Sequence, residues 1–384
     1  MPRFSLLRVD SQTGARRGRI LTPHGHVDTP AFMPVGTQGS VKALTPDDLR
    51  SLGVQLVLAN TYHLYLRPGV SIVRQLGGLH AFMGWDGPLL TDSGGFQVYS
   101  LAALRKVSDD GVIFRSHLDG SEHLMTPELA IQIQQGLGVD IILAFDECLG
   151  YPATHAEARA SMELTVHWAR RSLAAHRTGA LDHQACFGII QGGGYEDLRR
   201  TCVEALGDLG FDGFAIGGLA VGEPKSLMYD LTEYTANLLP ADRPRYLMGV
   251  GKPQDLVEAV SRGVDLFDCV LPTRNARSGS LFTSEGTVVI KNARYARDAR
   301  PVDPDCACYA CVRFSRAYLR HLFMAEELLA HRLSTLHNLH YYMDLMARIR
   351  HAISEDRYAE FRKTFLDRHA SLEEPALTTQ EESL

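Results

Sequence analysis

Short apolar runs recur along the chain, and each ends in a polar or glycine-rich turn. Most are almost continuously apolar, as strands are when both faces of a parallel sheet are buried. Segments with helical periodicity lie between several of them, as at 127–138, 155–176 and 253–263. This alternation predicts an α/β fold and favours a (β/α)8 barrel, with a doubly wound open sheet as the alternative because strand counting does not establish closure. The eight apolar runs are 29–38, 54–60, 88–95, 140–147, 186–193, 213–219, 245–251 and 266–274.

Two antiparallel hairpins are expected in addition to the barrel. Asp-Gly pairs at 110–111 and 119–120 predict one of them over residues 107–126, inserted after the third strand. The opening residues 4–25 predict the other, which would cover the floor of the barrel.

The C-terminal quarter of the chain departs from the alternation as well. Residues 281–340 contain a short strand pair and three clustered cysteines, which predicts a metal-binding subdomain near the end of the barrel. The last residues, 369–384, are acidic and lack apolar periodicity, so we expect a disordered tail. The rest, residues 1–368, is predicted to be a single barrel domain with these insertions.

Composition narrows the class of protein. The chain has 384 residues, of which 45% are hydrophobic and 22% charged, so it can bury a large core and is not disordered as a whole. No apolar run reaches the roughly 18–20 residues of a membrane span, and Arg3, Arg8 and Asp10 stand where a signal peptide would be apolar. An odd number of cysteines, seven, fits reduced thiols. We expect a soluble, cytoplasmic protein with no membrane partner.

Positive charge is concentrated in one segment. The whole chain has 39 Lys and Arg against 45 Asp and Glu, a net charge of −6. Between Arg274 and Ala325 there are nine Lys or Arg and four Asp or Glu, a net of +5. A basic segment in an acidic protein is a candidate phosphate-contacting surface, although charge alone favours the simpler interpretation of an unevenly charged, solvated face.

Polar residues follow several of the predicted strands directly. They are Asp92, Asp146, Gln191, the pair Gly217-Gly218, and Asp268. In a barrel the carboxyl ends of the strands converge on one mouth, so these residues would line one pocket. Each aspartate alone is explained as well by capping the next helix, but that explanation is weak for all of them together.

The combination suits the breaking of a glycosidic bond to a purine. Asp146 and Gln191 offer acceptors and a donor that match the edge of a guanine-like base, and Gly217-Gly218 lets backbone groups approach a flat ligand. Asp92 and Asp268 would divide nucleophilic attack and proton transfer, and a covalent intermediate would give retention.

A metal site and a phosphate-binding loop are also predicted. Cys306, Cys308 and Cys311 form a C-x-C-x2-C motif, which with one histidine would make a closed, structural zinc site. His337 is the preferred fourth ligand, and His331 and His340 are the alternatives. The loop 271–280 carries Arg274 and Arg277, and Lys252 stands before a predicted helix, so these cations would meet phosphates or a base edge.

These motifs together resemble the bacterial tRNA-guanine transglycosylases of queuosine biosynthesis, also called queuine tRNA-ribosyltransferases. The resemblance extends over residues 4–345 and rests on the segments 91–97, 144–148, 189–193, 217–223, 246–253 and 267–274 and on the cysteine motif. It implies a (β/α)8 barrel with one structural Zn²⁺. It also implies exchange of guanine at wobble position 34 of tRNAs with GUN anticodons (Asp, Asn, His, Tyr) for the free base preQ1, 7-aminomethyl-7-deazaguanine. The exchange would be a double displacement through a covalent enzyme–RNA intermediate, in a homodimer.

The resemblance assigns roles to individual residues. Asp268 is similar to the nucleophile of the family, and Asp92 to its general acid/base. The implied base contacts are Asp92, Ser93, Gly94, Gly95, Phe96, Asp146, Gln191, Gly218, Leu219 and Met248. The implied tRNA contacts are Gly249, Val250, Gly251, Lys252, Pro253, Gln254 and Asp255, and the implied wobble readers are Leu271, Pro272, Thr273, Arg274 and Asn275. The implied metal ligands are Cys306, Cys308, Cys311 and His337.

Within the family, Val221 and Cys148 are similar to the narrow, preQ1-accepting pocket of the bacterial enzymes. Three alternatives remain: a queuine-inserting transglycosylase, a non-catalytic tRNA-binding paralogue, and a barrel glycosidase that acts on free nucleosides or sugars.

Overall fold

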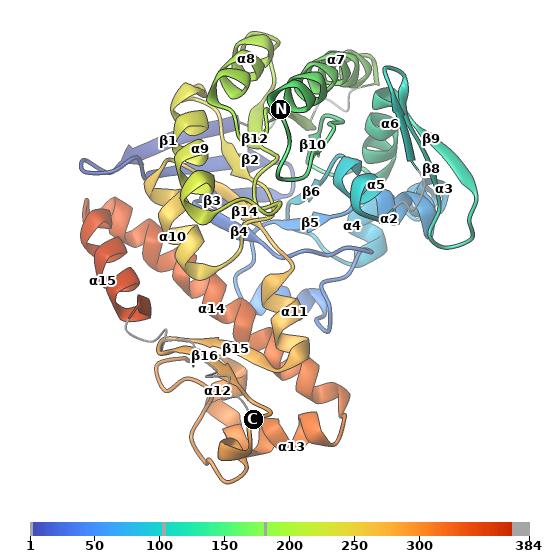
Figure 1. Cartoon of the computed structure of the whole chain (residues 1–384). Coiled ribbons are helices and arrows are strands. Elements are labelled where there is room, and N and C mark those ends of the chain that lie inside the picture. The colour runs from blue at the N-terminus through green and yellow to red at the C-terminus, as the bar shows by residue number, and fades with distance from the viewer. Residues whose placement is uncertain (1–2, 102–104, 180–182, 371–384) are drawn as a thin grey trace, which may run out of the picture.

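Eight parallel strands form one sheet, and the chain enters them in sequence order around a ring. The structure is a computed structural model that describes residues 3–101, 105–179 and 183–370 (Figure 1). The order of the strands in the sheet is β4-β14-β13-β12-β11-β10-β6-β5. Their bounds are β4 (Ala31–Met33), β5 (Val57–Ala59), β6 (Leu89–Thr91), β10 (Ile141–Leu143), β11 (Ala185–Ile190), β12 (Gly213–Ile216), β13 (Arg245–Leu247) and β14 (Leu266–Asp268).

The first and last strands of this order also meet. Val35, just beyond β4, forms a parallel bridge with Leu58 of β5. On the same seam the Leu58 amide donates to the Pro34 carbonyl at 3.1 Å, and the Gly36 amide donates to the Leu58 carbonyl at 2.6 Å. The sheet therefore closes, narrowly, into a (β/α)8 barrel, which confirms the predicted fold and excludes the open sheet. Seven of the eight predicted apolar runs contain one of its strands, and the run 186–193 begins one residue after the start of β11.

Helices surround the barrel, as Figure 1 shows. Their apolar faces and the outer faces of the strands form one large core, whereas the inward side chains of the strands form a second, smaller core. The helices are α1 (Pro46–Ser51), α2 (Thr61–Leu66), α3 (Val70–Gln75), α4 (Gly78–Met83), α5 (Gly95–Leu101), α6 (Pro127–Leu137), α7 (His155–Gly179), α8 (Glu196–Gly207), α9 (Lys225–Leu238), α10 (Pro253–Ser261) and α11 (Leu271–Ser278). The expected loop over 271–280 is thus mostly helical, because Pro272 sits in the first turn of α11 and Gly279 ends it in a left-handed conformation.

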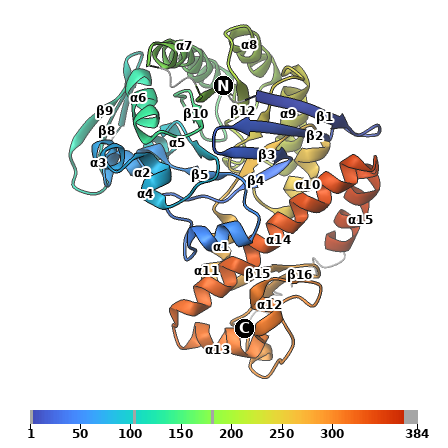
Figure 2. The ribbon, with the colours of Figure 1, turned by 180° about the vertical axis from the view of Figure 1, so that it is seen from behind.

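A three-stranded antiparallel sheet lies against the barrel (Figure 2). It consists of β1 (Arg3–Val9), β2 (Arg16–Thr22) and β3 (Gly25–Thr29), in that order. Ile20 and Val27 pack into the inner core of the barrel, so the sheet covers the floor as predicted, with one strand more than the expected hairpin.

Buried charges hold this floor sheet in place. The carboxylate of Asp265, the residue before β14, accepts from Arg16 Nε at 3.1 Å and from the Arg245 amide at 2.8 Å. All three residues are buried. Removing one partner of such a group leaves an uncompensated charge and typically costs about 3–5 kcal/mol, so the contact is a strong constraint on how the N-terminal sheet docks.

The predicted insertion after the third strand is a small sheet of its own. It comprises β7 (Arg105–Ser108), β8 (Gly111–Arg115) and β9 (Glu122–Met125), paired antiparallel in that order. The expected single hairpin over 107–126 is therefore a three-stranded meander, because both Asp-Gly pairs make reversals.

The chain after α11 forms a lobe beside the barrel, at the bottom of Figure 1. Its elements are β15 (Ser280–Thr283), β16 (Gly286–Val289), the 3-10 helix η1 (Ala293–Tyr295), α12 (Tyr309–Arg313) and α13 (Arg316–Met324). They enclose a separate small core. The long helix α14 (Leu328–Ser354) connects this lobe to the barrel: its Tyr342 ring packs on Phe32 of β4, with centroids 4.7 Å apart, and on Phe282 of β15 at 5.4 Å.

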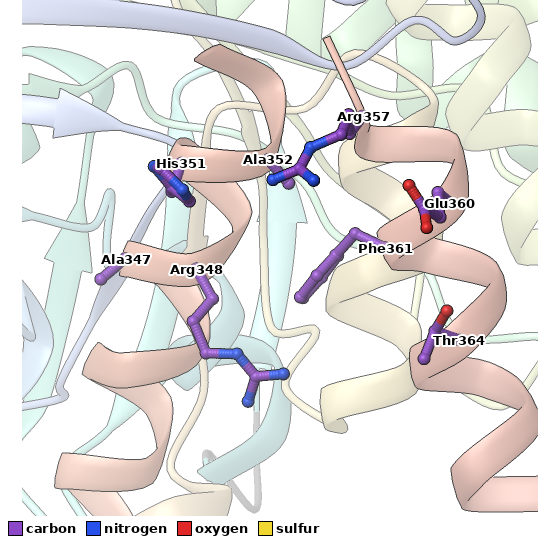
Figure 3. A pocket seen from close by; sticks show the side chains of 8 residues that line it. All are labelled: Ala347, Arg348, His351, Ala352, Arg357, Glu360, Phe361 and Thr364. Atoms are coloured by element: carbon purple, nitrogen blue, oxygen red, sulfur yellow. The ribbon is translucent and has the colours of Figure 1, made fainter. Parts of the chain in front are cut away.

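Helix α15 (Tyr358–Ala370) folds back along α14. Between the two lies a surface groove of about 510 Å³, lined by residues of α14 and α15 with Arg357 of the connection (Figure 3). Phe361 projects into it toward Arg348, whose guanidinium lies 5.5 Å from the ring centroid. None of its lining residues belongs to the mouth of the barrel. Most of the expected tail, 371–384, lies outside the described residues.

Among the helices of the described part of the chain, none combines the length and the apolar character that crossing a membrane requires.

Candidate active site

The carboxyl ends of the barrel strands surround a cavity of about 400 Å³. It collects most of the residues that the sequence predicts for one pocket: Asp92, Ser93, Phe96, Asp146, Gln191, Gly218, Leu219, Met248 and Asp268 all line it. Gly94 and Gly95, the other two expected base contacts, do not line it. At Gly95 an added Cβ would come within 2.5 Å of the Asp146 carbonyl oxygen, so this glycine lets two strand-end loops pack together.

Asp92 stands directly after β6 and is 7% exposed. Its Oδ2 accepts from Asn60 Nδ2 at 2.5 Å, and its Oδ1 accepts from the Thr61 amide, in the first turn of α2, at 2.8 Å. Burial raises the pKa of Asp92 to about 6, and the nearby negative charge of Asp268 also raises it, while the hydrogen bonds from Asn60 and Thr61 lower it. A carboxyl with this pKa exchanges its proton near neutral pH, as a general acid/base must.

Asp268 is the last residue of β14. Its Oδ1 accepts from the Tyr246 hydroxyl at 2.6 Å and from the Gly249 amide at 2.9 Å. Burial raises the pKa of Asp268 and these two hydrogen bonds lower it. Because both donors bind the same oxygen, they fix the orientation of the carboxylate.

Asp146 is the centre of a short polar network. The Ser93 hydroxyl donates to its Oδ1 at 2.7 Å, and Gln191 Nε2 donates to its Oδ2 at 2.9 Å. All three side chains are buried, and burial raises the pKa of Asp146. Three strand ends, those of β6, β10 and β11, are thereby connected through side chains that offer both acceptors and donors to a planar ligand.

The loop after β12 forms one wall of the cavity and packs tightly on this network. An added Cβ would lie 2.7 Å from Gln191 Nε2 at Gly217 and 2.4 Å from Gln191 Oε1 at Gly218, where φ is +65°. Farther along, Glu223 accepts from the amides of Ala220 and Val221 at 2.5 and 3.0 Å. These contacts hold the loop close to the carboxamide, which larger residues at the glycine positions would prevent.

A cluster of possible metal ligands lies in the C-terminal lobe. The ligand atoms of Cys306, Cys308, Cys311 and His337 all lie within 4.8 Å of one another. His337 Nδ1 is 3.8, 3.5 and 3.3 Å from the three sulfur atoms in that order. Its Nε2 lies 2.7 Å from the Phe282 carbonyl oxygen, so that nitrogen carries the proton and Nδ1 is left to bind a metal. Of the alternatives, His340 approaches Cys306 alone, and His331 lies against the Phe323 ring.

A second group of possible ligands, His24, His80 and Asp140, lies at the floor of the barrel. Its contacts are explained without an ion. Asp140 accepts from the Leu89 amide at 2.8 Å, and His24 Nδ1 lies 2.8 Å from its other oxygen, so the aspartate clamps the β2–β3 turn to the strands.

Comparison with known proteins agrees with this architecture. Residues 10–371 match the family model described as "Queuine tRNA-ribosyltransferase". The chain is 57% identical over 367 residues to the queuine tRNA-ribosyltransferase of Caldanaerobacter subterraneus subsp. tengcongensis, which covers 96% of this chain and 97% of that protein. It is 56% identical over 372 residues to the queuine tRNA-ribosyltransferase of Thermoanaerobacter pseudethanolicus, an alignment that covers 97% of this chain and 99% of that protein. It is 57% identical over 366 residues to that of Halothermothrix orenii, with 95% of this chain and 97% of that protein covered. The chain belongs to the queuine tRNA-ribosyltransferase family. It is a tRNA-guanine transglycosylase, as the sequence motifs implied, and not a barrel glycosidase for free sugars.

The family resemblance implies tRNA contacts for segment 249–255, and the residues of this segment differ in exposure. In the turn and first residues of α10, Gly249 and Lys252 are exposed, and Gln254 is partly exposed. Val250, Gly251, Pro253 and Asp255 are buried, and Asp255 is bound inside the protein by Lys225 and Tyr229. The buried members therefore shape the turn that presents Lys252.

The predicted wobble readers lie on α11, beside the cavity. Arg274 is exposed and lines the cavity. Leu271 and Asn275 are partly exposed, whereas Pro272 and Thr273 are buried. The Pro272 carbonyl accepts from Asn338 of α14 at 2.9 Å, which anchors the helix to the lobe. In this queuine tRNA-ribosyltransferase, α11 thus presents Arg274 toward the cavity from a fixed base.

Some residues that contact the two central aspartates were not predicted. Asn60 follows β5 as Asp92 follows β6, so the rule that singled out strand ends would have found it if it had been applied to amides in every strand. Tyr246 lies inside β13 and is buried, and nothing in the local sequence distinguishes it from a core tyrosine. Its hydroxyl acquires a role only when β13 and β14 are paired.

The raised pKa of Asp92 has a measurable effect on stability. The folded state binds the Asp92 proton more tightly than the unfolded chain, whose carboxyl titrates near 3.8, so this group lowers the free energy of unfolding as the pH rises from about 4 to about 6. Asp92→Asn lacks this equilibrium and should gain stability relative to the wild type between pH 4 and pH 7, by about 3 kcal/mol at most. Urea denaturation followed by circular dichroism measures the difference.

The control is Asp86→Asn. Arg50 lowers the pKa of this exposed carboxyl, so its relative stability should change with pH in the opposite direction. A stability difference for Asp92→Asn that does not change with pH would contradict a raised pKa.

Proposed function

We propose that this protein exchanges guanine at wobble position 34 of tRNAs with GUN anticodons for preQ1, in queuosine biosynthesis. The observation that carries the proposal is one cavity lined by two carboxylates suited to glycosidic chemistry, Asp92 and Asp268, and by a base-sized polar network, Asp146 with Gln191. The family membership supports tRNA as the macromolecular substrate, and a tRNA substrate agrees with a cytoplasmic location.

In the proposed first step, Oδ2 of Asp268 attacks C1′ of the ribose as the bond from C1′ to guanine N9 breaks. The bond electrons leave with guanine, which takes a proton from Asp92, and an ester forms between Asp268 and the ribose. The hydrogen bonds from Tyr246 and Gly249 to Oδ1 orient the attacking carboxylate. In the second step Asp92 removes the N9 proton of preQ1, whose N9 attacks C1′ and releases Asp268. Two displacements return the original configuration.

The base would be recognised by its edge and its two faces. Asp146 would accept from N1–H and the exocyclic amine, Gln191 and the Gly218 amide would meet the remaining edge, and the Leu219 carbonyl would accept from the aminomethyl group of preQ1. Phe96 and Met248 would stack on opposite faces. Burial raises the pKa of the Cys148 thiol to about 12, so this neighbour of the base remains neutral.

Positive groups at the mouth would contact the tRNA. Lys252, at the start of α10, and Arg274, on α11, are exposed on two sides of the strand ends, and they would bind backbone phosphates or the bases next to position 34. The chain would act as a homodimer, for which the apolar residues exposed on the lobe are suited; these are Tyr309, Val312, Tyr318, Met324 and Leu328.

The exchange is tested with labelled guanine. It should enter unmodified tRNA with a GUN anticodon and not the same tRNA with the wobble guanine replaced. Asp268→Asn should abolish incorporation and also the covalent RNA adduct trapped with a base analogue, because no other group replaces the nucleophile. Asp47→Asn, an exposed carboxylate on α1, should behave as the wild type. An adduct that survives in Asp268→Asn would move the nucleophile to Asp92, and equal incorporation into both tRNAs would exclude position 34.

The choice of incoming base depends on the pocket wall. Val221 and Cys148 line the cavity, and their bulk would exclude the cyclopentenediol group of queuine. In competition with labelled guanine, preQ1 should therefore inhibit incorporation at a much lower concentration than queuine does. Val221→Gly should narrow this difference by admitting queuine. Equal competition by the two bases in the wild type would favour the queuine-inserting alternative.

The metal cluster fits zinc. Tetrahedral zinc with bonds of about 2.3 Å to sulfur and 2.0–2.1 Å to nitrogen separates its ligand atoms by roughly 3.5–3.8 Å, close to the distances from His337 to the three sulfurs. Three thiolates and one imidazole leave no position for substrate, so the ion would be structural and would hold α12 to α14.

Cys308→Ser should therefore lose the ion and unfold at a lower temperature. Atomic emission measures zinc per chain, expected near one in the wild type and well below it in the variant, and calorimetry measures the melting temperature. Cys202→Ser, a buried cysteine outside the cluster, is the control and should keep its zinc. Full zinc content in Cys308→Ser would contradict the assigned ligands.

A further inference from the structure

Arg199 is a charged residue in the core, directly behind the wall of the active-site cavity. It belongs to α8 and is 0% exposed. Its Nε donates to the Gly193 carbonyl at 3.0 Å, and its Nη2 donates to the Gly217 carbonyl at 3.2 Å and lies 3.5 Å from the Gly218 carbonyl. The guanidinium thus binds backbone oxygens of the two loops, after β11 and β12, that carry Gln191 and the glycine pair.

This positive charge is not neutralised by a direct ion pair. Among the described residues no carboxylate lies within 4.0 Å of its nitrogens, and Nη1 has no hydrogen-bond partner there. Burial lowers the pKa of Arg199 to about 10, so the side chain is still charged at neutral pH. A buried, incompletely bonded guanidinium is costly for the fold, which points to a role besides packing.

The carbonyl that Arg199 holds belongs to the peptide group of the base-binding wall. In a trans peptide the C=O of one residue and the N–H of the next point in opposite directions. With the Gly217 oxygen directed at Arg199, the Gly218 N–H is directed away from it, on the side of the cavity that Gly218 lines. The same peptide is packed against the Gln191 carboxamide, because a Cβ at either glycine would overlap it.

We infer that Arg199 is a positioning residue that, through the Gly217–Gly218 peptide, strengthens the hydrogen bond from the Gly218 amide to O6 of the leaving base. When the bond from C1′ to N9 breaks, its electron pair is delocalised over the purine, including O6, until Asp92 supplies the proton. A cation on the peptide oxygen polarises the peptide, so its N–H donates more strongly to that negative charge. The inference rests on the proposed function and adds to it a group that does not touch the base.

The test compares two bases that differ at the relevant atom. Guanine has O6, whereas 2-aminopurine has hydrogen at that position and cannot accept from the Gly218 amide. In Arg199→Met the KM for guanine in exchange into tRNA should rise about tenfold, with kcat reduced as well, as expected when a buried hydrogen bond to developing charge is weakened. The inhibition constant of 2-aminopurine should change by less than about twofold, because its binding never used that bond.

Two further variants separate this role from a purely structural one. Arg199→Lys keeps the charge but cannot bridge both loops, so the KM for guanine should be intermediate and 2-aminopurine should again be unaffected. Arg200→Met removes the exposed neighbour, which donates to the Tyr234 hydroxyl at 3.0 Å and lies over the ring of the same tyrosine. This variant should match the wild type for both bases. If Arg199→Met does not fold, Arg199→Lys carries the same comparison.

The outcomes are distinct. Equal weakening of guanine and 2-aminopurine in the Arg199 variants would show that the arginine only supports the loops and would overturn the inference, as would an unchanged KM for guanine. Failure of the wild type to exchange guanine would instead refute the proposed function on which the inference rests.

Discussion

The two central carboxylates are buried at the same barrel mouth, and this constraint shapes the surrounding structure. Burial raises the pKa of both Asp92 and Asp268, and the negative charge of Asp268 raises the pKa of Asp92 further. The protein compensates with donors from neighbouring strand ends: Asn60 and Thr61 for Asp92, and Tyr246 and Gly249 for Asp268. Because these donors come from the end of β5 and the start of α2, and from β13 and the turn after it, the ionisation of the pair depends on the closed barrel.

The side of the cavity around Gln191 depends on a second constraint, the close approach of a backbone segment to a side chain. The Gly217-Gly218 pair brings a peptide group against Gln191, which is itself bonded to Asp146 and through it to Ser93. Behind the pair, the Arg199 guanidinium donates to the Gly217 carbonyl. The Gln191 carboxamide and the Arg199 guanidinium thus both lie against this one peptide group.

The C-terminal lobe contributes geometry to the mouth through α11 and α14. The three cysteines at 306–311 lie against His337 of α14, and the next residue, Asn338, donates to the Pro272 carbonyl of α11. Tyr342, one turn farther, packs on the barrel strand β4 and donates to the Gly251 carbonyl in the turn before α10. One helix thus connects the cysteine cluster to both segments that are proposed to contact tRNA.

The sequence alone determined the architecture and the main components of the site. Continuous apolar runs marked all eight strands, because a strand buried on both faces leaves no polar alternation, and the residues just after them were the ones gathered at the mouth. Spacing alone identified the three cysteines, but choosing among three histidines required the family resemblance. Local patterns were less reliable in three places. They predicted one strand too few in the floor sheet and in the insertion, and they predicted a loop where Pro272 lies in the first turn of α11.

What only the tertiary structure decided are the contacts between segments far apart in the chain. Three examples are the bridge between Val35 and Leu58 that closes the barrel, the hydrogen bond from Tyr246 that orients Asp268, and the hydrogen bond from Arg199 to the Gly217 carbonyl. In the sequence, Arg199 looks like an ordinary residue on a helix surface. The physical reason is the same for all three. A hydrogen bond across the barrel leaves no periodicity in the sequence, since the identity of each partner matters only after folding has removed both from water.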